Sequence, residues 1–366
     1  MNTKIYALII ALLLSYQSFA QKDSTTQKRF SITPLPLIVS DPFMGLGLGA
    51  LANINQLIGD AKTTRFSNYQ VYAMKTTNGQ FAAQANHTLF TNNESWMIQG
   101  KLQYLDWPEN VYVLGARTSS SNDAVERISY KAIEFEESLL KKVGEKNFIG
   151  LQYRLYNCWD IKSDKADSVS FFEKNAIGNK QFISSSFGVR FIHDSRDNVQ
   201  NAYKGNYAEV TINPNFSFLG STQQWTNIRV DMRSYIMLNK NINHAQVLAG
   251  RIMYEQAIGD VPYMIMPMFG RYFTTRGYVQ GRYRGKTFAS AEAEYRAHLW
   301  KRLGGVAFAG LHTVCEPNGN FQSVNPTAGG GIRLMLNKSQ RINLRVDYAV
   351  GIQGEGGLYF QITEAF

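Results

Sequence analysis

The sequence predicts an all-β protein, a 16-stranded antiparallel transmembrane β-barrel with a long sixth outer loop folded into the lumen. Three observations predict this class. The chain opens with an apolar segment typical of exported proteins. Later segments of about ten residues alternate apolar and polar side chains, as membrane-crossing strands do. Aromatic residues make up 13% of the chain and glycines number 30, yet mean hydropathy is only −0.25 and no later apolar run is long enough for a spanning helix.

Residues 1–20 match a secretory signal peptide. Lys4 supplies the positive start, residues 5–14 the apolar core, and Ser18-Phe19-Ala20 the small-residue cleavage site. An uncleaved anchor is the alternative. The short apolar run disfavours it, because a spanning helix needs about 20 apolar residues.

Residues 21–44 are expected to form a short polar periplasmic tether, and residues 45–366 the barrel. The tether ends in Pro34-Leu35-Pro36, which would lead into the barrel wall.

Alternation identifies sixteen candidate strands. In residues 289–299, Ala291, Ala293 and Tyr295 share one face, and the other face is polar. The least clear segments are 111–117 and 127–141, the second of which could also form an apolar helical stripe. The sixteen segments are roughly 45–54, 67–76, 80–91, 95–106, 111–117, 127–141, 146–160, 180–193, 206–219, 224–238, 244–258, 287–300, 305–315, 326–337, 341–351 and 357–366.

An even strand number places both termini in the periplasm and the long connections outside. The connection from about Gly259 to Lys286 is unusually long, and long loops are often functional. It is aromatic and glycine-rich, and it carries four arginines that seek acidic partners: Arg271, Arg276, Arg282 and Arg284. A compact plug or latch inside the barrel is therefore expected.

The net charge of +10 could indicate nucleic-acid binding, but an exported chain makes that unlikely as a partner, so none is expected. A basic barrel would instead meet anionic outer-membrane lipids, or offer a cationic lumen to anions. The two cysteines, Cys158 and Cys315, fall at the outer ends of well-separated strands. We favour two unpaired thiols over a disulfide.

No catalytic constellation is present, so we expect neither an enzyme nor a cofactor. The five histidines are scattered without metal-ligand spacing. The glycines at Gly45, Gly47 and Gly49 lack the strand-loop-helix context of a nucleotide loop.

Three segments together resemble the outer-membrane assembly and two-partner-secretion barrels of the BamA/TamA and bacterial surface antigen type. The first is Arg276-Gly277-Tyr278, which is similar to that family's Arg-Gly-aromatic motif in the sixth outer loop. The second is the turn that contains Asp194, Arg196 and Asp197, before the ninth strand. The third is the closing strand, which ends in the aromatic Phe366.

The resemblance implies that Arg276 tucks into the lumen and meets an acidic residue on strand thirteen. The matching stretch, residues 306–311, has no acid. A buried arginine without a partner would cost several kcal/mol. We therefore expect Glu292 and Glu294, which project inward from the neighbouring strand, to bind it. For the turn at Asp194, a self-satisfied set of hydrogen bonds is favoured over a metal site.

The resemblance also implies a seam between the first and last strands. Glycine weakens a strand, so Gly45, Gly47 and Gly49 on the expected first strand, facing Phe366 on the last, are the predicted seam residues.

The resemblance further implies a bacterial outer-membrane protein that inserts or exports polypeptide, or lipid, through its lumen and seam. The usual periplasmic POTRA domains have no room in residues 21–44. Two alternatives stay open: a passive or gated porin for small, perhaps anionic, solutes, and a pore completed by a separately encoded periplasmic partner. Substrate and oligomeric state are not defined by the sequence.

Overall fold

The computed structural model describes residues 29–115, 126–165, 170–241, 244–270, 275–315, 319–321, 323–338 and 341–366. The predicted signal peptide at residues 1–20 lies outside the described residues.

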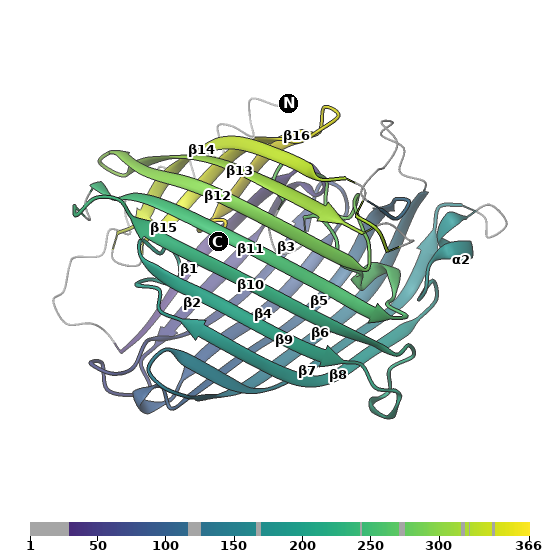
Figure 1. Ribbon diagram of the computed structural model, residues 1–366, viewed down its shortest axis with the longest axis horizontal. Coiled ribbons are helices and arrows are strands. Elements are labelled where there is room, and N and C mark those ends of the chain that lie inside the picture. Colours follow the sequence, from purple (N-terminus) through teal and green to yellow (C-terminus); the bar gives the residue numbers. More distant parts are fainter. Residues whose placement is uncertain are drawn as a thin grey trace.

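Sixteen antiparallel strands close into one barrel, in which each strand pairs with its sequence neighbours and β1 meets β16. The predicted fold class is confirmed. Figure 1 shows the strands tilted across the barrel wall. The strands are β1 (Phe30–Asp41), β2 (Gly45–Gln56), β3 (Ser67–Thr76), β4 (Phe81–Phe90), β5 (Trp96–Val111), β6 (Glu126–Lys142), β7 (Asn147–Ser163), β8 (Phe182–Asp194), β9 (Gly205–Pro214), β10 (Trp225–Met237), β11 (Gln246–Gly259), β12 (Thr287–Trp300), β13 (Leu303–Val314), β14 (Asn325–Asn337), β15 (Ile342–Val350) and β16 (Gly356–Ile362).

In the part of the chain that the structure describes, helical structure is confined to short connections: α2 (Phe171–Asn175), η2 (Asn92–Glu94), η3 (Ser217–Leu219) and η5 (Tyr263–Ile265). Ser170 caps α2 by accepting a hydrogen bond from the Glu173 amide. Within the described ranges, no helix is both long and apolar enough to cross a membrane.

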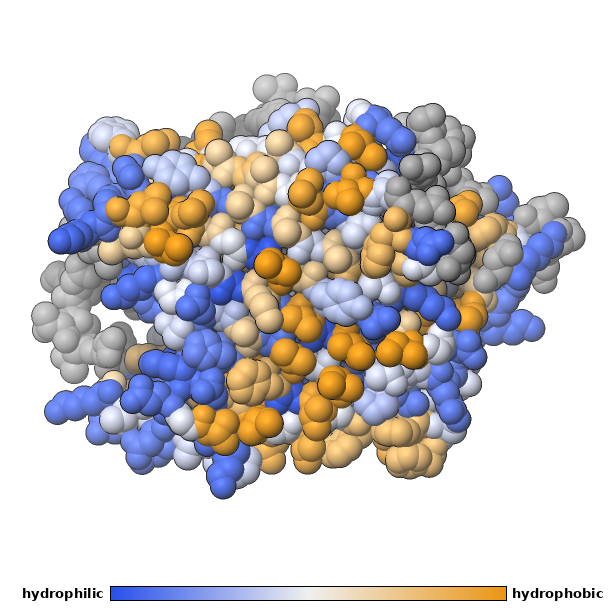
Figure 2. Space-filling model, in the orientation of Figure 1, coloured by the Kyte–Doolittle hydropathy of each residue, from blue (hydrophilic) through white to orange (hydrophobic). Residues whose placement is uncertain are grey.

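The two faces of the wall differ as the alternation predicts. Along β12, Ala291, Ala293 and Tyr295 are exposed, whereas Glu292 and Glu294 are buried. Figure 2 shows apolar side chains over the middle of the strands and hydrophilic ones toward the ends. The polar face therefore lines the lumen, and the apolar face meets lipid.

The first strand was predicted in the wrong place. β1 begins at Phe30 and pairs with β2 along its whole length, so the barrel start at 45 is wrong and so is the part of the expected tether from residue 30 on; residues 21–28 lie outside the described residues. The strand includes Pro34 and Pro36, although proline lacks an amide donor for a ladder. They lie two residues apart, so their ring nitrogens share one edge. The ladder to β2 continues through both, which leaves their nitrogens toward the β16 side.

The expected strand 111–117 is not present over its described part, since β5 continues only to Val111; residues 116–117 lie outside the described ranges. The segment around 127–141 is strand β6, so the helical alternative is excluded. The predicted number of strands, sixteen, is nevertheless correct, because the missed strand β1 and the extra strand 111–117 cancel. The four strands expected between 45 and 106 consequently run in the direction opposite to the predicted one.

Connection length distinguishes the two ends of the barrel. The strands on either side of the long connections 112–125, 164–181 and 260–286 place all three connections at one end of the barrel. This is the end at which α2 lies in Figure 1. The opposite end has tight turns such as 143–146 and 301–302. Short periplasmic turns and long outer loops are the rule for such barrels, so we assign the α2 end to the outside. The connection 260–286 is then the sixth outer loop.

Candidate functional site: the lumen loop and its anchors

The sixth outer loop between β11 and β12 lies inside the barrel. Nearly every described residue from Val261 to Gly285 is buried or nearly so. The loop contacts β5 through Glu109 and contacts β12 and β15 through Glu292 and Asp347. A segment that reaches strands on several sides of a closed wall can do so only from within the lumen. The described part of the loop is thus enclosed by the barrel.

Arg276 is the centre of the first anchor. Its Nη2 donates to Glu292 Oε1 and, at 2.6 Å, to Glu294 Oε2. Its Nη1 donates to Asp347 Oδ2 at 2.7 Å. The guanidinium is 2% exposed, and the three carboxylates are equally enclosed. The structure therefore brings Arg276 together with both glutamates that the sequence nominated.

A ring completes this anchor. Arg276 Cζ lies 3.5 Å from the centroid of Phe308 on β13, an arrangement suited to cation–π attraction. β13 therefore contributes an aromatic face where the resemblance leads one to expect an acid. Burial lowers the pKa of Arg276, but Glu292, Glu294 and Asp347 raise it more, so its pKa lies above the usual range. The arginine stays charged.

Gly277 and Tyr278 tie the next two residues to the barrel wall. The Gly277 backbone has φ +102°, in the region that favours glycine, and its amide donates to the Tyr359 hydroxyl at 2.8 Å. The Tyr278 hydroxyl donates to the Pro326 carbonyl at 2.6 Å. Tyr278 also packs in an aromatic cluster with Phe269 and Tyr283. All three residues of the motif thus have defined partners on the wall: Arg276 on β12 and β15, Gly277 on β16 and Tyr278 on β14.

A second anchor was not predicted. Arg284 donates to Glu109 Oε1 of β5 at 2.9 Å and to the Tyr263 carbonyl at 2.8 Å. The Tyr263 hydroxyl in turn donates to the Tyr112 carbonyl at 2.9 Å. Arg284 and Glu109 are 2% and 4% exposed. The loop is therefore held on two sides of the lumen.

Asp347 is the functional residue of the first anchor that sequence reasoning missed. It accepts from Arg276 and, at 2.5 Å, from Arg333, which also bonds Glu364 at 2.7 Å. Its signal was present: Asp347 falls on the inward, polar face of the alternating segment 341–351. Alternation predicts which side chains of a strand face the lumen. It does not predict which of them a side chain of the loop contacts.

The carboxylates of the turn at Asp194 bond partners within the turn and beyond it, so the turn is not satisfied by its own residues alone. Asp194 accepts from Arg196 at 2.9 Å and from Arg65 at 3.0 Å. Asp197 accepts from the Tyr203 amide and, at 2.8 Å, from Arg341. Among the described residues, no group of three or more His, Cys, Asp or Glu side chains could hold a metal ion.

The predicted seam glycines are not at the seam. Gly45, Gly47 and Gly49 lie on β2, between β1 and β3. They were misplaced because β1 was not recognised.

Phe366 is also absent from the seam. The chain leaves β16 after Ile362, turns at Thr363 with φ +79°, and is drawn inward as Glu364 pairs with Arg333. Phe366 is buried in a cluster with Tyr235, and its carbonyl accepts from Arg296 at 2.8 Å.

Cys158 and Cys315 are both free and buried, as expected. Neither thiol belongs to the loop anchors.

The Omp85 superfamily domain matches residues 47–366. Among solved structures, BamA from Haemophilus ducreyi lacking POTRA domains 1–3 is similar, with a TM-score of 0.60 and 13% identity over 92% of this chain and 70% of that one. CdiB from Escherichia coli has a TM-score of 0.61 and 9% identity, over 93% of this chain and 63% of that one. CdiB from Acinetobacter baumannii has a TM-score of 0.59 and 8% identity, over 92% and 60%. The chain thus spans less than two thirds of either CdiB chain. No curated protein matches the sequence.

Proposed function

Since the chain belongs to the Omp85 superfamily, whose barrels are bacterial outer-membrane proteins, we propose that it inserts or exports polypeptide through its lumen and the β1–β16 seam. The mechanism requires two movements: release of the loop from its anchors and opening of the wall between the first and last strands. Neither movement involves bond chemistry, so no cofactor is proposed.

The pairing deficit at the seam supports this function most directly. Only Ser40 and Phe360 are in register between β1 and β16. By contrast, β1 and β2 pair continuously from Phe30 to Asp41. β16 ends at Ile362, so within the described chain the periplasmic half of β1 has no strand on its β16 side. Few ladder hydrogen bonds need to break for the wall to part here.

The prolines of β1 reduce the cost of opening further. Pro34 and Pro36 present no amide donors toward the seam. An opened edge strand leaves unpaired backbone groups, which is costly in lipid. Exposure of an edge with fewer donors therefore costs less free energy. The carbonyls of that edge can still pair with an incoming strand.

The lumen loop supports a pore that is closed at rest. Its two anchors, Arg276 and Arg284, cross the outer half of the barrel and bind carboxylates on different strands. Release of Arg276 alone would expose three carboxylates to one another. The loop is thus suited to switch between an anchored and a released state, and the pore is not expected to conduct continuously.

A passive anion porin is the second candidate, and its main argument weakens. Five arginines on the polar faces of the alternating segments would by themselves favour an anion-selective lumen. Each has a carboxylate partner: Arg229–Glu209, Arg233–Asp231, Arg296–Glu294, Arg341–Asp197 and Arg345–Asp347. Paired arginines attract anions less. A periplasmic partner encoded separately remains compatible with the polypeptide-transport proposal.

Crosslinking the seam tests the proposal. The double variant Ser40→Cys/Phe360→Cys would be reconstituted into liposomes and treated with a short bifunctional thiol reagent. The readout is the rate at which an unfolded eight-stranded outer-membrane barrel, diluted from urea, inserts into those liposomes. We expect acceleration by the untreated protein and loss of most of it after crosslinking.

A matched pair controls for crosslinking itself. Ala52 and Val71 are in register between β2 and β3, away from the seam. Crosslinking Ala52→Cys/Val71→Cys should leave the acceleration intact. Equal rates with the seam locked or free would rule out lateral opening, and large steady conductance in planar bilayers would favour the porin.

A further inference from the structure

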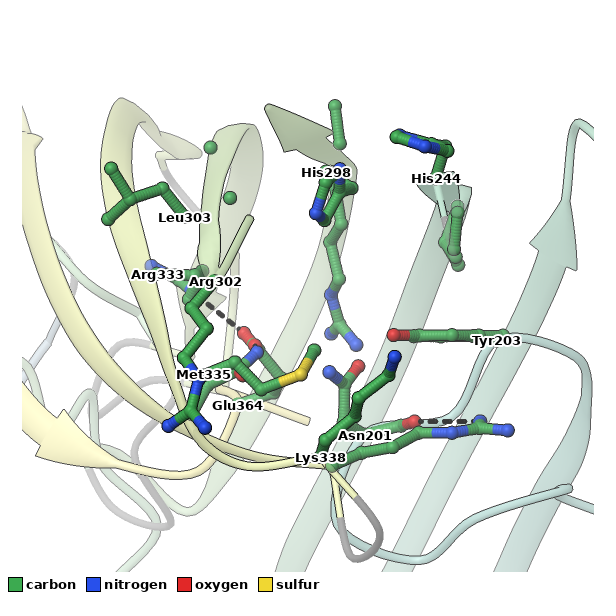
Figure 3. A pocket seen from close by; sticks show the side chains of 18 of the residues that line it. Asn201, Tyr203, His244, His298, Arg302, Leu303, Arg333, Met335, Lys338 and Glu364 are labelled. Atoms are coloured by element: carbon green, nitrogen blue, oxygen red, sulfur yellow. Dashed lines mark hydrogen bonds and ion pairs between the residues drawn. The ribbon is translucent and has the colours of Figure 1, made fainter. Parts of the chain in front are cut away.

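A basic pocket opens at the periplasmic end of the barrel, away from the lumen loop. It has a volume of about 690 Å³, which is within the usual range for small-molecule sites. Its wall is made by the periplasmic ends of β11 to β15 and by the turns next to them. Figure 3 shows Arg302 and Arg333 on one side, Tyr203 and His244 on the other, and Lys338 between them.

The pocket carries an excess of positive charge. Six of its lining residues are lysine or arginine, and Glu364 is its one acidic residue. Arg296, Arg333 and Arg341 have carboxylate partners. Lys301, Arg302 and Lys338 are exposed and make no ion pair among the residues that the structure describes. Three unpaired cations around one cavity attract an anion.

Buried polar atoms on the pocket wall also lack partners. Within the described chain, Arg296 Nη1 and His298 Nδ1 make no hydrogen bond. Asn201 Oδ1 and Asn343 Oδ1 also make no hydrogen bond there. Buried polar groups are normally satisfied. Of these atoms, Arg296 Nη1 is a donor and suits an anion, whereas the two amide oxygens are acceptors, as is Nδ1 of a neutral His298 whose Nε2 donates to the Lys301 carbonyl.

The pocket lies at the depth of the lipid headgroups. Leu299 and Trp300, at the end of β12, are 66% and 61% exposed on the outer face of the wall. Lys301 lies 4.3 Å from the Trp300 ring. Tryptophan is enriched at the membrane interface. An anion at this depth is most simply a phosphate, either of a lipid headgroup or free in the periplasm.

We propose that the basic pocket, with Lys301, Arg302 and Lys338 at its rim and Arg296 in its wall, binds a phosphate group. Arginine matches phosphate with paired parallel donors, and lysine adds a point charge. The C-terminal segment forms part of the wall through Glu364, which already neutralises Arg333. The rim cations therefore do most of the recognition.

The test uses the folded protein in neutral detergent with two probes, inorganic pyrophosphate and dihexanoyl phosphatidylglycerol. Calorimetry should give saturable binding to one site per chain. The variant Lys301→Gln/Arg302→Gln/Lys338→Gln should weaken it about a hundredfold, because each cation near a membrane surface contributes about a fivefold factor. All three side chains are exposed, so the variant should fold normally, which heat-modifiable mobility checks.

A control variant removes the same charge from the same end of the barrel. Lys62, Lys141 and Lys146 are exposed at other periplasmic turns, and Lys141 lies 5.9 Å from the Trp96 ring, much as Lys301 lies against Trp300. Lys62→Gln/Lys141→Gln/Lys146→Gln should bind as the unmodified protein does.

The two probes distinguish the source of the phosphate. Binding of both in competition supports a general phosphate site. Binding of the lipid alone assigns a headgroup, and binding of pyrophosphate alone assigns a soluble phosphate. No saturable binding, or equal loss in the control variant, overturns the proposal. So does binding of an oligoglutamate peptide when both phosphate probes stay silent, since the pocket would then serve acidic polypeptide.

Discussion

Arg276 is a single cation that holds three buried carboxylates from two strands. Glu292 and Glu294 lie on the same face of β12, and Asp347 approaches from β15. Without the arginine these carboxylates would repel one another in a site shielded from water. The residue therefore links the loop to the wall and also keeps the wall itself stable.

The first prediction concerns this link. Arg276→Ala should lower the free energy of unfolding by about 3 kcal/mol or more, because removing one member of a buried ion pair leaves uncompensated charge. Arg276→Lys should recover part of the loss, since it keeps the charge but not the forked donors. Urea unfolding followed on cold gels measures both. An unchanged transition in the alanine variant would show that Arg276 is not an anchor.

Gly277 allows a second prediction, in which backbone strain and steric contact can be separated. A Cβ at Gly277 would lie 3.0 Å from the Val350 carbonyl carbon, whereas a Cβ at Gly220 would meet nothing within 4 Å. Both residues have positive φ, +102° and +92°. Gly220→Ala should cost about 1 kcal/mol from backbone strain alone. Gly277→Ala should cost at least about 1 kcal/mol more from overpacking.

Protease sensitivity of the loop is the second readout for this pair. Gly277→Ala should expose the lumen loop to digestion in intact liposomes, and Gly220→Ala should not. Equal stability loss in the two variants would mean that the close approach to Val350 has no energetic weight.

At the scale of single residues, the sequence predicted part of the site for a physical reason. Glu292 and Glu294 were found because an inward acid must compensate a buried arginine. Asp347 lay on an equally inward face, and Arg284 lay in the same loop, but the pairing of a loop with distant strands depends on the folded path of the loop. Periodicity along a strand carries no information on that path.

Among the elements, β1 and β16 form the weakest junction of the wall. They share one register pair, and the chain after Ile362 turns into the lumen instead of extending the ladder. Thr363 still donates to the Asn343 carbonyl at 2.8 Å, so β15 holds the end of β16 while β1 does not. If the wall parts here as proposed, we expect it to open from the periplasmic half of this junction.

Hydrogen exchange tests this uneven stability. Amides of β16 and of residues 31–37 in β1 should exchange at least about tenfold faster than those of β13 and β14, because local opening exposes the least-paired elements first. Exchange resolved by mass spectrometry in detergent measures the difference. β13 serves as the internal control, since it is paired continuously on both sides. Uniform protection around the barrel would contradict a weak seam.

The elements that the sequence predicted well are those with lipid on one side and polar lumen on the other. β12 and β15 alternate cleanly for that reason. β1 does not, because Leu35, Leu37 and Val39 face inward as apolar residues, and Leu37 and Val39 pack on the core under the lumen loop. The prolines obscured the strand further. The inward turn of the C-terminus depends on Glu364 meeting Arg333, a tertiary contact that no local pattern carries.

For the whole molecule, the lumen loop sets the charge balance of the pore. Arg276, Arg282 and Arg284 come from the loop, whereas Glu109, Glu292, Glu294, Asp347 and Glu355 belong to the wall or its connections. The wall is therefore acidic where the loop sits. We expect attraction between loop and wall to keep the pore closed, and removal of the loop to leave carboxylates facing water.

Replacing residues 263–284 by a short glycine-serine linker should convert a mostly closed barrel into a steadily conducting one. A barrel of sixteen strands can hold an aqueous channel, and the exposed carboxylates should make it select cations over anions. Planar-bilayer recordings in a potassium chloride gradient give both the step size and the sign of the reversal potential. Removal of residues 217–220, an outer turn that includes the 80%-exposed Phe218, is the control and should leave the barrel closed. Steady conductance by the unmodified protein would contradict a closed resting pore. Anion selectivity after loop removal would show instead that the paired arginines of the wall, and not its carboxylates, govern the field in the lumen.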